Sequence, residues 1–126
     1  MKELSGAEWH LLESLWEDSP KVGSQIVTDM EKRKGWSRST TLTMLRRMTE
    51  KGLVSCDSSG KMNHYTPLVG REEAVGKETD SFLKRVYQGS VSMLVNGFVE
   101  RQKLTSRELE ELRQILDRAK EDVHEH

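Results

Sequence analysis

The chain has 126 residues, enough for one ordinary domain or two small ones, and 34% of them are hydrophobic while 33% are charged. No apolar run approaches the roughly 20 residues of a membrane span, and no basic stretch followed by an apolar core marks a secretory signal. We therefore expect a cytoplasmic protein without membrane insertion, and its one cysteine, Cys56, excludes an internal disulfide framework.

Positive charge is concentrated in the middle of the chain, although the net charge is -1. Residues 1–32 carry three basic and seven acidic side chains, residues 33–70 carry seven and two, and residues 71–126 carry ten and twelve. A local basic face matters more for phosphate contact than the total charge does, so the middle segment is a candidate nucleic-acid surface. The alternative is a solvated helix face.

Two helices are predicted ahead of the basic segment. The first opens with the capping-box pair Ser5 and Glu8, ends before Pro20, and carries a helical stripe of apolar residues: Trp9, Leu12, Leu15 and Trp16. The second is expected to begin near Ser24 and to end in the basic cluster at residues 32–35. Its expected inward-facing residues are Ile26, Val27 and Met30. Burial requires such spacing, so we interpret the tryptophans as core residues.

The stretch from Trp36 to Gly52 predicts a helix with two different faces. Ser37 is a good N-cap, and Gly52 follows the last periodic residue as a left-handed helix stop would. One face is an expected buried stripe of Thr41, Met44, Leu45 and Met48. The other carries donors that suit the floor of a DNA major groove, namely Ser39, Thr40, Thr43, Arg46 and Arg47. This is a candidate recognition helix.

Two short strands are expected after this helix, at residues 53–57 and 62–67, joined by a tight loop that contains Gly60. Three helices followed by a hairpin is the order of a winged-helix domain, in which the hairpin is the wing. The sequence therefore predicts a mainly α protein with a small β-hairpin wing, and a winged helix-turn-helix domain over residues 1–70.

The remaining residues, 71–126, are predicted to be helical. A break is expected at Gly89-Ser90, and the last helix opens with the capping-box pair Thr105 and Glu108. Its apolar residues step by three and four along Leu109, Leu112, Leu116, Ala119 and Val123.

So short a helical segment cannot bury this much apolar surface well alone, which predicts a homodimerisation domain. Its candidate contact residues are Phe82, Leu83, Val86, Tyr87, Leu94, Val95, Phe98, Leu109, Leu112 and Leu116. The alternative is an intramolecular three-helix cap on the first domain.

Residues along nearly the whole chain resemble the penicillinase-repressor family of winged-helix transcriptional repressors (BlaI/MecI type, with the copper-responsive CopY repressors as relatives). In the first domain they are Ala7-Glu8-Trp9, Leu15-Trp16, Trp36-Ser37, Thr40, Thr43-Met44-Leu45, Arg47, Lys51-Gly52 and Tyr65-Thr66-Pro67. In the second they are Ser81-Phe82-Leu83, Tyr87 and Gly89. The resemblance implies a dimeric repressor of a resistance-type operon that binds a palindromic double-stranded DNA operator.

By position, the resemblance implies that the residues facing base edges are Ser39, Thr40 and Thr43. It implies that the residues reaching phosphates are Arg47 and Lys61. Helical geometry adds Arg46 to the same outer face, and the start of the helix completes the candidate set with Ser37 and Arg38. Leu42 departs from the pattern, because it places an apolar residue on this face. Contact with a thymine methyl group and plain exposure are both open explanations.

The resemblance also implies a way to release the operator. In the β-lactam resistance members, a membrane-bound sensor triggers proteolysis within the dimerisation domain beside a phenylalanine, and Gly97-Phe98 lies at the matching place. Cutting there would sever the apolar stripe assigned to the dimer. The alternatives are a glycine helix break beside a core phenylalanine, and a repressor released by a different signal.

Copper sensing is not expected. The copper-responsive relatives carry a cysteine-rich motif that this chain lacks, and a single thiol cannot form the multi-thiolate site that Cu(I) prefers. Cys56 and His64 could lie near each other across the hairpin, but two ligands do not make a site. We therefore predict no metal and no cofactor.

Two other function classes compete with a repressor. A protein-interaction module that reuses the fold predicts that Arg46 and Arg47 pair with nearby acids and that Leu42 lies in a protein interface. The second class is an enzyme. The sequence contains no phosphate-binding loop, no nucleophile elbow and no cluster of residues at metal-ligand spacing, so we predict no enzymatic activity.

Overall fold

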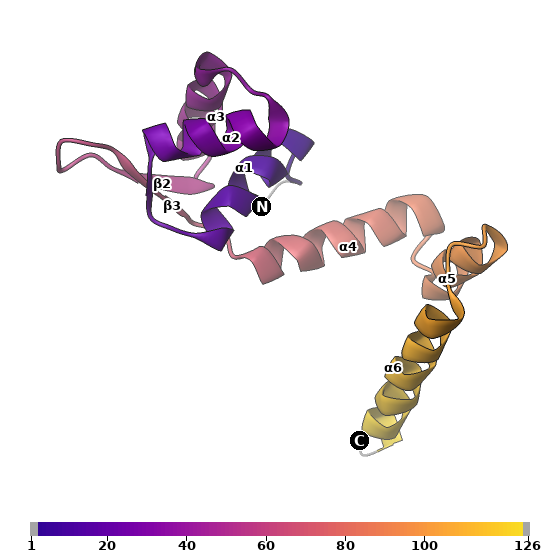
Figure 1. Ribbon diagram of the computed structural model, residues 1–126. Coiled ribbons are helices and arrows are strands. Elements are labelled where there is room, and N and C mark those ends of the chain that lie inside the picture. The colour runs from indigo at the N-terminus through magenta and orange to yellow at the C-terminus, as the bar shows by residue number, and fades with distance from the viewer. Residues whose placement is uncertain (1–2, 125–126) are drawn as a thin grey trace. The chain divides into compact units, whose positions relative to one another are not determined.

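The computed structural model describes residues 3–124 and divides the chain into two compact units, residues 1–79 and 80–126. Residues 1, 2, 125 and 126, at the outer ends of the two domains expected from the sequence, lie outside the described part. The elements follow the order α1, β1, α2, α3, β2, β3, α4, α5 and α6 (Figure 1).

Three helices form most of the first unit: α1 (Gly6–Glu17), α2 (Gly23–Lys34) and α3 (Arg38–Glu50). The predicted capping box opens α1, because Ser5 Oγ accepts from Glu8 N at 3.1 Å and Glu8 Oε1 accepts from Ser5 N at 2.8 Å. The turn between α2 and α3 begins at Gly35, whose φ of 67° ends α2 in the left-handed region. The helical part of the winged-helix prediction is confirmed.

The sheet has three strands rather than the two expected. The predicted hairpin is present as β2 (Val54–Asp57) and β3 (His64–Pro67), and it projects away from the helices (Figure 1). A two-residue strand, β1 (Lys21–Val22), adds to the other edge of β3, so that the antiparallel order is β1-β3-β2. Two residues are too few to show an alternating pattern, so the sequence does not predict β1.

The core of the first unit lies among its three helices and the base of the hairpin. Its fully buried apolar side chains are Leu11, Leu12, Leu15, Ile26, Met30, Leu45 and Met48. Trp9 and Trp16 pack half-buried against this core, edge to face with ring centroids 5.5 Å apart. Trp16 Nε1 also donates to Val69 O at 2.9 Å, which satisfies the indole group. The tryptophans are core residues, as predicted.

Helix α4 (Arg71–Tyr87) runs from the first unit into the second, which also contains α5 (Val91–Glu100) and α6 (Ser106–His124). The predicted break lies at Gly89, whose φ is 82°, and Ser90 caps α5 by accepting from Met93 N at 3.1 Å. Thr105 and Glu108 form the predicted capping box at the start of α6. No residue from 80 to 123 is buried in the single chain.

Candidate nucleic-acid interface

Helix α3 begins with a cluster of hydroxyl groups. Ser37 caps it as predicted, with Oγ accepting from Thr40 N at 3.2 Å. The same hydroxyl lies 2.9 Å from Thr40 Oγ1 and 3.2 Å from Ser39 Oγ. The capping contact holds the Ser37 side chain, whereas Ser39 and Thr40 keep exposed hydroxyl groups beside it.

Six of the seven candidate DNA-contact residues of α3, all but Thr40, lie in two neighbouring rows. Residues four apart on a helix lie one above the other, so one row is Ser39, Thr43 and Arg47, and the next is Arg38, Leu42 and Arg46. All six are exposed except Thr43, which is half-buried. Leu42, 37% exposed, thus stands between two arginines one turn away on either side.

The first row borders a shallow hollow in the helix surface. This hollow has a volume of about 230 Å³ and is lined by Ser39, Thr40, Thr43, Met44 and Arg47. The expectation that Met44 belongs to the buried stripe is wrong in part, because Met44 is half-buried and lines this hollow with the polar residues. Thr41, Leu45 and Met48 are fully buried, as predicted.

The arginines of α3 have no carboxylate partner, in contrast to three other basic residues of the unit. Arg33 pairs with Glu17, Lys21 with Asp29 and Lys51 with Glu8. Between residues 3 and 124, no carboxylate lies within 4.0 Å of the basic groups of Arg38, Arg46 and Arg47. The pairing that a protein-interaction module predicts for Arg46 and Arg47 is therefore absent from this part of the chain.

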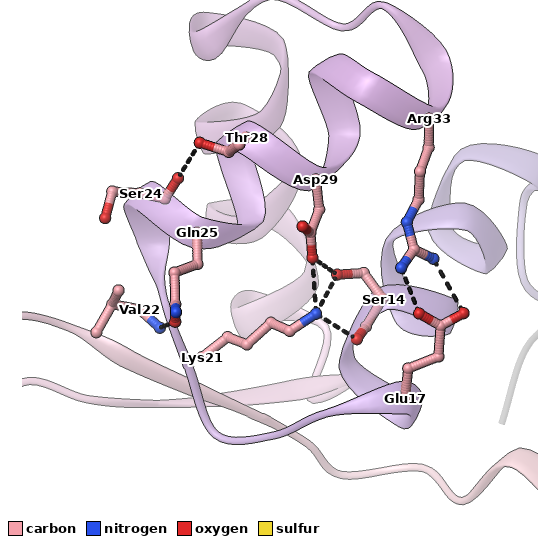
Figure 2. A network of polar contacts seen from close by, with 9 residues as sticks. All are labelled: Ser14, Glu17, Lys21, Val22, Ser24, Gln25, Thr28, Asp29 and Arg33. Carbon is pink, nitrogen blue, oxygen red and sulfur yellow. Dashed lines mark hydrogen bonds and ion pairs between the residues drawn. The ribbon is translucent and has the colours of Figure 1, made fainter.

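A polar network that local sequence patterns do not predict joins α2 to α1 (Figure 2). The buried Lys21 Nζ donates to Asp29 Oδ2 at 2.7 Å, to Ser14 O at 2.8 Å and to Ser14 Oγ at 3.0 Å. Ser14 Oγ donates to Asp29 Oδ2 at 2.8 Å. Burial alone would raise the pKa of Asp29, but the hydrogen bonds from Lys21 and Ser14, with the charge of Lys21, lower it.

A second ion pair joins the end of α3 to the start of α1. Lys51 Nζ lies 2.9 Å from Glu8 Oε2, while the other oxygen of Glu8 serves the capping box. Burial would raise the pKa of Glu8, and the hydrogen bonds from Ser5 and Lys51 outweigh that effect and lower it. Charged groups thus hold α2 and the end of α3 in position against α1.

The wing is a hairpin with Lys61 in its exposed loop. Ser59 N donates to Asp57 Oδ1 at 3.0 Å, and these Ser59 hydrogen bonds lower the pKa of Asp57. Cys56 lies opposite Tyr65 whereas His64 lies opposite Asp57, so alternation along the strands puts Cys56 and His64 on different faces. No cluster of three potential metal ligands occurs among the described residues.

The candidate dimer residues of the second unit are all at least partly exposed: Phe82, Leu83, Val86, Tyr87, Leu94, Val95, Phe98, Leu109, Leu112 and Leu116. Phe82 and Tyr87 pack edge to face at 5.8 Å. Between α5 and α6 lies an apolar groove of about 340 Å³, whose lining includes Leu94, Phe98 and Leu112. None of the described helices is long and apolar enough to cross a membrane.

Gly97 does not break a helix, so that reading of the sequence is wrong. Helix α5 continues through it to Glu100, and Gly97 O accepts from Arg101 N at 3.2 Å. A Cβ at this position would lie in ordinary contact with Tyr87, 3.4 Å from its Oη. Phe98, beside it, is 46% exposed rather than buried in a core.

The model of the penicillinase repressor family matches residues 4–118. The chain belongs to this family. The methicillin resistance regulatory protein MecI of Staphylococcus aureus (strain N315) is 32% identical over 116 residues, which cover 92% of this chain and 94% of MecI. The penicillinase repressor of Bacillus licheniformis is 30% identical over 118 residues, which cover 94% of this chain and 92% of that repressor.

Two solved structures are also similar. The DNA-binding domain of the repressor BlaI matches 58% of this chain and 93% of its own length, with 28% identity and a TM-score of 0.51. The monomeric form of Bacillus licheniformis BlaI in complex with the blaP half-operator matches 57% and 88%, with 26% identity and a TM-score of 0.52. The winged-helix fold and the repressor family expected from the sequence are confirmed.

Proposed function

We propose that this chain is a dimeric repressor that places α3 in the major groove of a palindromic operator. The observation that carries the proposal is the pair of rows on α3, in which hydroxyl groups stand beside three arginines without carboxylate partners. Donors of this kind read base edges and neutralise phosphates. The relative BlaI, solved with the blaP half-operator, supports the same use of the fold.

In this proposal the α3 residues and the wing have different roles. Ser39, Thr40 and Thr43 face base edges, and Arg38, Arg46, Arg47 and Lys61 neutralise phosphates, with Ser37 positioning the first turn. Leu42 lies between the phosphate-binding arginines and contacts a thymine methyl group. DNA binding of this kind takes place in the cytoplasm and involves neither catalysis nor a cofactor.

Dimerisation occurs through the second unit. Large apolar side chains there remain exposed in the single chain, for example Phe98 at 46% and Leu116 at 64%. A second copy would cover them, and two-fold symmetry would then present two α3 helices to two half-sites about 34–36 Å apart. An intramolecular cap is the less supported alternative, because the exposed residues continue along α5 and α6.

Release of the operator follows proteolysis at Gly97–Phe98 by a protease under a membrane-bound sensor. The bond lies within α5, and Phe98 lines the apolar groove between α5 and α6. Cutting there would separate α6 from α4 and reduce the dimer surface of each fragment. A repressor released by another signal is the alternative, and would leave this bond intact in induced cells.

Fluorescence anisotropy tests the DNA-binding part of the proposal. The full chain is titrated against duplexes from the region upstream of its own gene, against the blaP half-operator, and against scrambled duplexes, at several salt concentrations. We expect selective binding whose affinity falls steeply as salt increases. Equal binding to all duplexes, or none, favours the protein-interaction module instead.

A further inference from the structure

Met62 is an exposed apolar residue at the tip of the wing. The residue is 58% exposed and belongs to the loop between β2 and β3. The hairpin projects away from the helices (Figure 1). Within residues 3–70 the exposed large hydrophobic side chains are Leu42, Met62 and Leu68. Two of these three lie on the elements that the proposed function brings to DNA.

Hydrogen bonds hold the loop around Met62 on both sides. A ring nitrogen of His64, Nδ1, lies 3.2 Å from Met62 O, and the Asp57 side chain accepts from Ser59 N at 3.0 Å. Six residues, 58–63, thus join the two strands, with one such contact near each end of the loop. Contacts that restrain a loop before binding reduce the conformational entropy that is lost on binding, so an apolar contact made there costs less.

We propose that Met62 enters the minor groove of the operator beside the major groove that α3 occupies, and that it selects base pairs without a minor-groove amino group. This inference rests on the proposed function. The minor groove is only about 6 Å wide, and an unbranched methionine is slim enough to fit there, as apolar wedges do in other minor-groove proteins. Neighbouring Lys61 supplies a charge that the negative potential of a narrow groove attracts.

The selectivity follows from the shape of the groove floor. A G·C pair projects the guanine N2 amino group into the minor groove, whereas an A·T pair presents only acceptor atoms there. An apolar side chain that fills the groove would collide with the amino group and leave its N–H groups without partners. The wing would therefore favour A·T pairs at its own positions, independently of the bases that α3 contacts.

Base analogues that change only the minor groove test this directly. A duplex is first selected by the wild-type chain from a random library. Each adenine is then replaced in turn by 2,6-diaminopurine, which adds the minor-groove amino group and keeps the major-groove pattern of adenine. Inosine in place of guanine makes the opposite change. We expect the wild type to bind about tenfold more weakly when diaminopurine lies under the wing, since about 1.4 kcal/mol corresponds to a factor of ten.

Variants assign the effect to Met62. Met62→Ala is expected to bind the unmodified duplex several-fold more weakly and to bind modified and unmodified duplexes equally, while Met62→Leu keeps part of the discrimination. Leu68→Ala is the matched control, because Leu68 is 59% exposed in the same unit but follows β3 rather than lying at the tip. It should discriminate as the wild type does.

Two outcomes overturn the inference: a wild type that binds every diaminopurine duplex as well as the parent, or a Met62→Ala variant that discriminates as the wild type does. Both require selective binding to the parent duplex, so they leave the proposed function standing. If the wild type selects no duplex from the library, the proposed function fails and this inference fails with it.

Discussion

Lys21 Nζ lies 2.7 Å from Asp29 Oδ2, and this ion pair joins the strand β1 to the helix α2 that precedes α3. Lys21 is only 8% exposed, and both groups also bind Ser14 on α1 (Figure 2). Removing one partner of such a pair leaves the other charge poorly solvated. The placement of α2, and so of α3 beside it, depends on a group of charges inside the domain.

The first prediction concerns acid stability. Asp29 has a lowered pKa in the folded chain, so the unfolded chain binds more protons and stability is lost as the pH falls from about 4 downward. Asp29→Asn removes this group and should make the decline shallower, while lowering stability at pH 7 by about 1–3 kcal/mol. The decline will not vanish, because the pKa of Glu8 is also lowered.

Tryptophan fluorescence during urea unfolding, repeated from pH 7 to pH 3, measures this difference. Trp9, Trp16 and Trp36, the three tryptophans of the chain, all lie in the first unit, so the signal reports that unit alone. If the stability of Asp29→Asn falls as steeply with pH as that of the wild type, the ion pair is not what makes the domain sensitive to acid.

The second prediction is a gain in stability from Thr41→Val. Thr41 is fully buried in α3, and its Oγ1 has no hydrogen-bond partner among the described residues. A buried hydroxyl without a partner costs free energy, and valine keeps the shape without the polar atom. We expect the free energy of unfolding to rise by about 1 kcal/mol. Thr43→Val is the control: it makes the same chemical change at a half-buried surface position and should change stability little.

Much of the fold could be predicted because its signals are local. The capping boxes at Ser5 and Thr105 and the left-handed glycine at Gly52 each depend on residues a few positions apart. The short strand β1 could not be predicted in this way. It exists because Lys21 pairs with Tyr65, which is 44 positions away, and because Lys21 reaches Ser14 and Asp29.

The candidate site was predictable only as a face of a helix. Helical spacing placed Ser39, Thr43 and Arg47 together, and the structure has them around one hollow. Spacing could not show that Met44 forms part of that hollow. Met44 lies at the edge of the apolar stripe, and a small rotation of the helix about its axis moves such a residue from the buried face to the exposed one. Nor could it separate the arginines of α3 from Arg33, since pairing with Glu17 on another helix is a tertiary contact.

The third prediction separates phosphate contact from base contact on α3. Arg47→Ala should weaken binding to all duplexes and reduce the slope of log K against log salt by about 0.9, the value for one phosphate contact. Thr43→Ala should leave that slope unchanged and cost on the order of 1–3 kcal/mol at one base pair only. Anisotropy titrations on operator and scrambled duplexes measure both. Arg118→Ala, on α6, is the control and should behave as the wild type; an equal loss there would mean that the effect is merely one of net charge.

The fourth prediction tests the dimer through Leu116→Glu. Leu116 is 64% exposed in the single chain, so a charge there should leave the fold of the chain intact and disturb only a partner. We expect a monomer in sedimentation, unchanged affinity for a half-operator and at least about a hundredfold weaker binding to a palindromic operator, because the second half-site no longer adds to the first. Gln114→Glu makes the same change in charge on the opposite flank of α6 and should remain dimeric. A dimeric Leu116→Glu variant would exclude this stripe from the interface.

The fifth prediction concerns the bond between Gly97 and Phe98. A protease binds its substrate as an extended strand, so α5 must open locally before this bond can be cut, and the rate follows the population of the open form when opening is rapid. Glycine inside a helix is less stable than alanine by roughly 0.5–1 kcal/mol. Gly97→Ala should therefore keep α5 closed for more of the time, and the added Cβ would lie in ordinary contact with Tyr87, 3.4 Å from its hydroxyl.

Thermolysin, which cuts before large apolar residues, measures the effect on the full chain. We expect cleavage between Gly97 and Phe98 to slow about two- to fivefold, the change in open population that 0.5–1 kcal/mol produces. Gly76→Ala is the matched control, since Gly76 also lies inside a helix, α4, with open space around its missing side chain. That variant should stabilise α4 and leave cleavage at Phe98 unchanged. Equal protection in both variants would show that cleavage requires unfolding of more than α5, and that Gly97 does not set the rate at which the second unit is cut.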